Sequence, residues 1–226
     1  MEVTLLSYTE DPQRAVATAA RLCYAPIGAA ELKEKMSDGQ VAKVLEAIMK
    51  SGHYSALEHA SFSFAIDGVS RALTHQLVRH RIASFNQQSQ RYVAHVGDPD
   101  VVTPPAIVAD ADRRKVFDNA LQEAYRAYAA LLEAGCEPED ARYVLPNACV
   151  SKIVATMNIR ELLHFFSVRC CRRAQWEIQE LGTRMLGLVE PIAPYIFMDA
   201  GAPCRRGPCG EGKMTCGNPF EKVARP

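Results

Sequence analysis

The spacing of apolar residues switches between two periods along the 226-residue chain, and this limits the fold more than any other feature. In the segment 61–67, Phe62, Phe64 and Ile66 lie on one side and Ser61, Ser63 and Asp67 on the other, which predicts a strand with one buried face. Longer segments repeat their apolar residues every three or four positions, as amphipathic helices do. Because strands and helices do not alternate regularly, we expect an α+β fold with an antiparallel or mixed sheet and long amphipathic helices, not a doubly wound sheet.

The same two periods place the other elements, and polar aperiodic stretches indicate loops. A capping hydroxyl, acidic residues and an early proline predict a helix start at 9–12. We expect further helices at 38–52, 69–79, 113–134, 139–145 and 159–189, strands at 3–7, 91–96 and 153–157, a loop at 84–90 and a proline-containing connection at 102–112.

The composition is that of a folded protein, since 48% of the residues are hydrophobic and 23% are charged. We expect one domain at 1–200. The segment 201–226 is rich in Gly, Pro, Arg and Cys, and we expect it to be weakly ordered.

The charges balance, with 26 basic and 26 acidic residues, which disfavours nucleic acid or a membrane surface as a partner. No stretch approaches the ~18 apolar residues of a membrane span, and the first residues lack the basic start and apolar core of an export signal. Eight cysteines in this context predict reduced thiols and a cytoplasmic protein. Cys204, Cys209 and Cys216 lack the close cysteine pair of common zinc sites, so we expect no metal.

The densest polar cluster is the segment 79–92, which joins cationic groups to hydroxyls and amides at the end of a predicted helix. Guanidinium groups match phosphate oxygens in two-pronged geometry, and amide side chains can read the edge of a planar nucleobase. These residue types suit a phosphorylated nucleoside. A solvated basic turn fits them as well, and the residue types alone do not decide between the two.

The order of residues in this cluster resembles the signature of the flavin-dependent thymidylate synthases and matches it at every fixed position. The signature reads Arg-His-Arg, two residues, Ser, one residue, Asn, two residues, Ser, one residue, Arg-Tyr. The resemblance covers roughly residues 1–195 and continues in the segments 53–59, 139–142, 158–160 and 174–177 and at Gln76, His164 and Arg169.

The resemblance implies a homotetrameric α+β enzyme of de novo thymidylate synthesis. Such enzymes methylate dUMP to dTMP with methylenetetrahydrofolate as carbon donor, and NADPH supplies the reducing equivalents through bound FAD. No Gly-x-Gly-x-x-Gly run is present, so we expect a non-Rossmann FAD site built from cationic side chains of several segments.

Matching the family motifs residue by residue implies two overlapping sets of contacts. Gln87 and His164 stand where some members carry Glu and Asn. The FAD set is Ser55, Arg79, His80, Arg81, Gln87, Asn158, Arg160 and His164. The dUMP set is Gln76, Arg79, Gln87, Gln88, Ser89, Gln90, Arg91, Arg142 and Arg169.

Arg169 is our candidate catalytic residue. Carbon 5 of uracil becomes nucleophilic when the imide proton is removed or polarised, and a fixed guanidinium beside the imide stabilises the resulting anion. An arginine stays protonated, so it stabilises charge and does not act as the base. No histidine or acidic residue stands at a spacing from Ser89 that would mark this serine as an activated nucleophile. We therefore assign Ser89 to phosphate binding and not to nucleophilic catalysis.

Helix geometry separates two of these arginines. Arg160 and Arg169 are nine residues apart, which is about half a turn out of phase on a continuous helix. Such a helix cannot aim both at one pocket, so we expect active sites shared between subunits.

Two other functions were weighed. A non-catalytic nucleotide- or RNA-binding protein is disfavoured by the zero net charge and the few aromatic residues near the cluster. A folate-dependent synthase with a cysteine nucleophile is disfavoured because the arginine-rich motif contains no cysteine.

Overall fold

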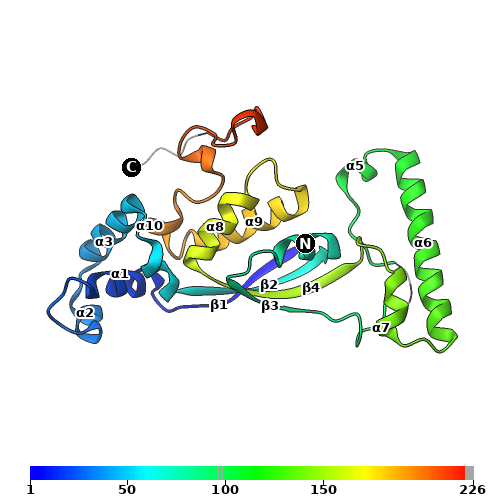
Figure 1. Cartoon of the computed structure of the whole chain (residues 1–226), viewed down its shortest axis with the longest axis horizontal. Helices are drawn as coiled ribbons and strands as arrows, with labels where there is room; N and C mark the ends of the chain where they lie inside the picture. The colour runs from blue at the N-terminus through cyan, green and yellow to red at the C-terminus, as the bar shows by residue number, and fades with distance from the viewer. Residues whose placement is uncertain (96, 98, 222–226) are drawn as a thin grey trace. The chain divides into compact units, whose positions relative to one another are not determined.

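The computed structural model describes residues 1–95, 97 and 99–221, which divide into two compact units (Figure 1). The first unit consists of Met1–Glu2, Ile66–Val78 and Phe85–Val154. The second unit consists of Val3–Ala65, Arg79–Ser84 and the chain from Ala155 onward.

One antiparallel sheet has the strand order β1-β2-β4-β3, so the expected α+β class is confirmed. Its strands are β1 (Glu2–Tyr8), β2 (Ser61–Ser70), β3 (Ala83–Gln87) and β4 (Val150–Asn158). Every strand begins in one unit and ends in the other.

The second unit contains most of the helices around the cavity that is described below as the candidate site. The core includes fully buried Phe62 and Phe64 of β2 and Phe165 and Phe166 of α8. Helix α8 packs against α9 and against the 3₁₀ turn η1, and α1 packs against α3 (Figure 1). The bounds are α1 (Pro12–Leu22), α2 (Ala29–Lys35), α3 (Asp38–Ser51), η1 (Tyr54–His59), α8 (Ile159–Arg169), α9 (Trp176–Val189), α10 (Pro194–Phe197), η3 (Pro203–Arg205) and η4 (Gly212–Met214).

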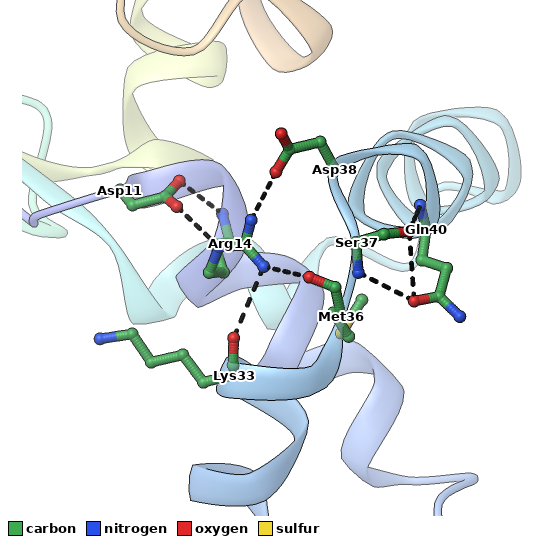
Figure 2. A network of polar contacts seen from close by, with 7 residues as sticks. All are labelled: Asp11, Arg14, Lys33, Met36, Ser37, Asp38 and Gln40. Carbon is green, nitrogen blue, oxygen red and sulfur yellow. Dashed lines mark hydrogen bonds and ion pairs between the residues drawn. The ribbon is translucent and has the colours of Figure 1, made fainter.

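Arg14 of α1 connects the first three helices of the second unit (Figure 2). Its guanidinium pairs with Asp11, the N-cap of α1, at 2.9 Å and with Asp38 of α3 at 2.6 Å. It also donates to the backbone carbonyl of Met36, between α2 and α3, at 2.5 Å. Ser37 then begins α3 as its N-cap. These contacts link α1 to the end of α2 and the start of α3.

The first unit contains the longest helix, α6, among the described residues. This helix buries Leu121, Tyr125 and Tyr128 on one face. The bounds of the unit's helices are α4 (Arg71–Leu77), α5 (Pro105–Val108), α6 (Ala111–Glu133), α7 (Pro138–Ala141) and η2 (Arg142–Val144). None of the helices in the described ranges is both long and apolar enough to cross a membrane.

The predictions around the polar cluster are partly wrong. The expected loop 84–90 contains β3, whose polar sequence forms a strand because it pairs with β4. The expected strand 91–96 begins with a turn at 91–93, and residue 96 lies outside the described residues. The expected helix 69–79 begins at Arg71, because β2 continues to Ser70 and the Ser70 hydroxyl caps α4.

Other differences are smaller. The connection 102–112 contains α5, and α2 and α10 were not predicted. The helical pattern expected at 159–189, in which the sequence allows a break, divides into α8 and α9.

Candidate functional site

A cavity of about 740 Å³ lies within the second unit. Three segments build it: η1, the loop that follows α4, and the first half of α8. The loop provides Arg79, His80 and Arg81, and α8 provides Arg160 and Glu161. The other lining residues include Tyr54, Glu58, Asn158, His164, Asp199 and Arg206.

The amino end of α8 lines this cavity. The Asn158 side chain accepts a hydrogen bond from the backbone N–H of Glu161 at 2.9 Å, so the predicted helix start is confirmed. Helix N-termini favour anions, and the arginines of the lining add positive charge. Arg160 pairs with Glu58 of η1, which holds its guanidinium at the wall. A phosphate-bearing ligand suits this set of donors.

A buried chain of hydrogen bonds connects Glu161, His80 and Arg169. The Nδ1 atom of His80 lies 2.8 Å from the Glu161 carboxylate, and both side chains are almost fully buried. Nε of Arg169 donates to Nε2 of His80 at 3.1 Å. The His80 ring also packs edge-on against Phe165, with ring centroids 5.0 Å apart.

Burial lowers the pKa of His80 below its ordinary value of 6.5. The Arg169 guanidinium and His164 act in the same direction, whereas the hydrogen bond and charge of Glu161 act against it. His80 is therefore neutral at physiological pH, with a ring nitrogen able to accept from Arg169.

His80, Glu161 and His164 also bring three possible metal-ligand atoms within 4.8 Å of one another. Both ring nitrogens of His80 are already used in hydrogen bonds, however. Arg160 and Arg169 add positive charge near this cluster, which opposes a bound cation. The geometry therefore favours a hydrogen-bonded chain over a metal centre.

We expect acid to weaken this arrangement through His80. The unfolded chain binds a proton at His80 near pH 6.5, whereas the folded chain does so only at lower pH, so the free energy of unfolding falls as pH drops below 6.5. Thermal unfolding measured at several pH values tests this. His80→Gln keeps an oxygen that can accept from Arg169 but does not titrate, so its melting temperature should fall less steeply with acid. Equal slopes for both proteins would contradict the assignment.

The predicted FAD residues do not all line the same cavity. Arg79, His80, Arg81, Arg160 and two further members of the set, Asn158 and His164, line the 740 Å³ cavity. Ser55 instead lines another cavity of about 420 Å³, together with His53. Gln87 belongs to the first unit.

Most of the predicted dUMP residues lie in the first unit, where several are held by protein partners. The amide nitrogen of Gln87 donates to the hydroxyls of Thr74 and Ser151, at 3.0 and 2.9 Å. Arg91 forms an ion pair with Glu139. Arg142 donates to the backbone carbonyl of the same glutamate at 3.0 Å.

The remaining members of this set are placed as follows. The side chain of Gln76 donates within α4 to the carbonyl of Ala72, and the Ser89 hydroxyl accepts from the backbone N–H of Arg91. Gln90 is buried, and Gln88 is half-buried. The members of the dUMP set in the first unit thus span α4, the end of β3 and the segments that follow it, up to η2.

Arg169 ends α8 and lines a third cavity, of about 360 Å³. This cavity also receives Cys171, Cys204 and Cys209. Next to Arg169, burial raises the pKa of the Cys170 thiol to about 11, so this cysteine is unreactive at neutral pH. The continuous helix α8 therefore directs Arg160 and Arg169 to different cavities, as its geometry predicts.

Several site residues were missed from the sequence. Glu58 lies in a segment that resembles the family, but nothing in its spacing indicates an ion pair with Arg160. Nothing in the sequence indicates that the carboxylate of Glu161 binds His80. Asp199 and Arg206 follow the last long helix, where no motif marks them.

Part of the C-terminal segment packs onto the connection between α8 and α9. Arg173 pairs with Glu211, and the Arg172 guanidinium lies 4.4 Å from the ring centre of Phe220. The weak order expected for 201–226 stays a prediction, and residues 222–226 lie outside the described residues.

Known proteins resemble this chain over nearly its whole length. A family model described as "Thymidylate synthase complementing protein" matches residues 4–195. A flavin-dependent thymidylate synthase of Geobacter sulfurreducens is 57% identical over 223 residues, which cover 98% of this chain and 96% of that protein. The Clostridium tetani protein of the same name is 47% identical, over 98% of this chain and 95% of that protein.

A solved structure is similar as well. It is that of a UMP/dUMP methylase, PolB, from Streptomyces cacaoi bound with 5-Br dUMP. The TM-score is 0.74 and the identity 27%, and the match covers 87% of this chain and 93% of that one.

Proposed function

This chain belongs to the family of flavin-dependent thymidylate synthases, and we propose that its cavity of about 740 Å³ is the FAD site. The enzyme methylates dUMP to dTMP, with methylenetetrahydrofolate as carbon donor and NADPH as reductant through FAD. When bound, the flavin carries the reducing equivalents from NADPH to the transferred one-carbon unit. The expected place of this reaction is the cytoplasm, where nucleotide biosynthesis occurs.

The residues of the cavity fit such a cofactor. Its volume lies within the ~300–1,000 Å³ typical of small-molecule sites. A diphosphate needs several cationic donors, and Arg79, Arg81 and Arg160 supply them beside the amino end of α8. The single observation that carries the proposal is this gathering of three motif arginines at one helix N-terminus. Ser55 and Gln87 remain proposed FAD contacts from the family motif alone.

We further propose that the predicted dUMP residues bind the nucleotide. Ser89, Arg91 and Arg142 are suited to the phosphate, since each carries a hydroxyl or guanidinium donor. The amides of the segment 87–90 and of Gln76 are suited to the pyrimidine edge. Arg169 polarises the imide, and its positive charge stabilises the uracil anion while the carbon–carbon bond forms.

We also propose a homotetramer in which subunits share active sites. Two observations support it: the FAD and dUMP sets lie mostly in different units of one chain, and α8 sends Arg160 and Arg169 to different cavities. A site assembled from neighbouring subunits would unite both sets.

The experiment that tests the FAD site is the variant Arg160→Ala. One charge-assisted hydrogen bond contributes ~1.5–3 kcal/mol, so the dissociation constant for FAD should rise about 10- to 100-fold. Flavin absorbance per mole of purified protein, followed by titration with FAD, measures this change.

Arg184→Ala provides the matched control. Arg184 lies on the exposed face of α9 and pairs with Glu180, so its loss should leave the flavin content within about twofold. Unchanged FAD affinity in Arg160→Ala would overturn the assignment of the cavity.

A further inference from the structure

Glu161 and Arg169 lie near opposite ends of α8, and His80 connects them through its two ring nitrogens. The Nε–H group of an arginine can only donate a hydrogen bond. Nε2 of His80 therefore accepts, and the neutral ring carries its hydrogen on Nδ1. That Nδ1–H donates to the carboxylate of Glu161, which lies 2.8 Å away.

Only one protonation state of the His80 ring satisfies both of its hydrogen bonds. If the hydrogen moved to Nε2, it would face the Nε–H of Arg169, and Nδ1 would present a lone pair to a carboxylate. A doubly protonated ring would place a second positive charge against the guanidinium. Glu161 therefore selects the tautomer that can hold Arg169.

We propose that Glu161 is a positioning residue for methylation, which fixes the His80 tautomer and thereby the orientation of the Arg169 guanidinium. The inference rests on the proposed catalytic role of Arg169. A guanidinium held at Nε has its plane fixed, and a small misplacement of a catalytic group costs up to about 100-fold in rate. The burial of Glu161 and of the His80 ring, which Phe165 also contacts, makes the connection rigid.

Glu161→Leu tests the proposal, because it removes the acceptor of the His80 Nδ1–H and puts an apolar side chain in the place of the buried carboxylate. We expect kcat for dTMP formation to fall at least about tenfold, since His80 no longer presents Nε2 to Arg169. With FAD added to saturation, the anaerobic bleaching of the flavin by NADPH should fall much less than kcat does, because this half-reaction does not need Arg169. A purely structural role would lower both half-reactions together.

A double-mutant cycle with Arg169→Lys decides whether Glu161 acts through Arg169. In the Arg169→Lys background, Glu161→Leu should lower kcat by less than about twofold. Equal losses in both backgrounds would overturn the inference and leave the role of Arg169 intact. Unchanged activity of Arg169→Lys alone would instead refute the catalytic assignment and, with it, the inference.

Glu161→Gln is the second variant, in case the leucine variant does not fold. Its amide keeps an acceptor oxygen but no longer imposes one tautomer, so its kcat should lie between those of the wild type and Glu161→Leu. Glu180→Gln, an exposed glutamate on α9, serves as the control with unchanged turnover. Loss of flavin in both Glu161 variants would assign Glu161 to the cofactor and overturn the proposal.

Discussion

Arg169→Lys should lower kcat for dTMP formation by about 100-fold or more while the protein retains its flavin. A lysine keeps the positive charge but loses the planar fork and the Nε–H that binds His80. Burial also lowers the pKa of Arg169 from its ordinary value, yet a guanidinium remains charged at neutral pH, whereas a buried ammonium loses its proton far more readily. Turnover under saturating substrates, together with the flavin absorbance, measures the effect.

Arg172→Lys is the matched control. Arg172 lies three residues further along the chain, and its guanidinium packs over the Phe220 ring. We assign it no role in the reaction, so its turnover should stay within about twofold of the wild type. If Arg169→Lys has the same turnover as this control, the planar charge does not matter and Arg169 is not the catalytic residue.

A mixture of Arg160→Ala and Arg169→Ala subunits, dissociated and re-formed at an FAD concentration that fills the wild-type site but not the Arg160→Ala site, should regain roughly a quarter of the wild-type activity if sites are shared. Each variant alone should be nearly inactive. Arg160 lines the 740 Å³ cavity and Arg169 the 360 Å³ cavity, although one helix carries both. When each complete site takes the two arginines from different subunits, random assembly leaves some sites with both.

A mixture of the double variant Arg160→Ala/Arg169→Ala with wild type contains the same numbers of intact and substituted arginines. In this mixture, however, both substitutions lie in the same subunit. Shared sites predict about a quarter of the activity for both mixtures, whereas sites within one subunit predict about half for this mixture and none for the first. The second pattern would exclude sites shared through these arginines. The ratio of the activities of the two mixtures thus separates the models.

The fold was predictable where a local signal and the tertiary structure agree. Gly52 ends α3 in the left-handed region, at φ 76°, and Asn158 caps α8, which agrees with the expected end of the helix 38–52 and the expected start at 159. The segment 83–87 was not predictable, because its polar residues show no apolar alternation. It is a strand because β4 supplies the hydrogen-bonding partner, which a single segment does not reveal.

The site was predictable where its functional residues lie close together in the sequence. The motif located Arg79, His80 and Arg81, which line the cavity together. It did not indicate the carboxylates that hold Arg160 and His80, because Glu58 and Glu161 approach these partners only when η1 and α8 are in place. Periodicity alone predicted that Arg160 and Arg169 diverge, since that result depends only on helix geometry.

In its hydrogen bonds with Thr74 and Ser151, the side chain of Gln87 is the donor. Thr74 gives its own hydroxyl hydrogen to the carbonyl of Arg71 at 3.0 Å, so toward Gln87 its oxygen has a lone pair and no hydrogen to offer. An amide NH₂ fits that oxygen, whereas a glutamate at position 87 would bring a second hydrogen-bond acceptor against it. A glutamate therefore fits there only if the Thr74 hydroxyl first turns its hydrogen from the Arg71 carbonyl toward the carboxylate.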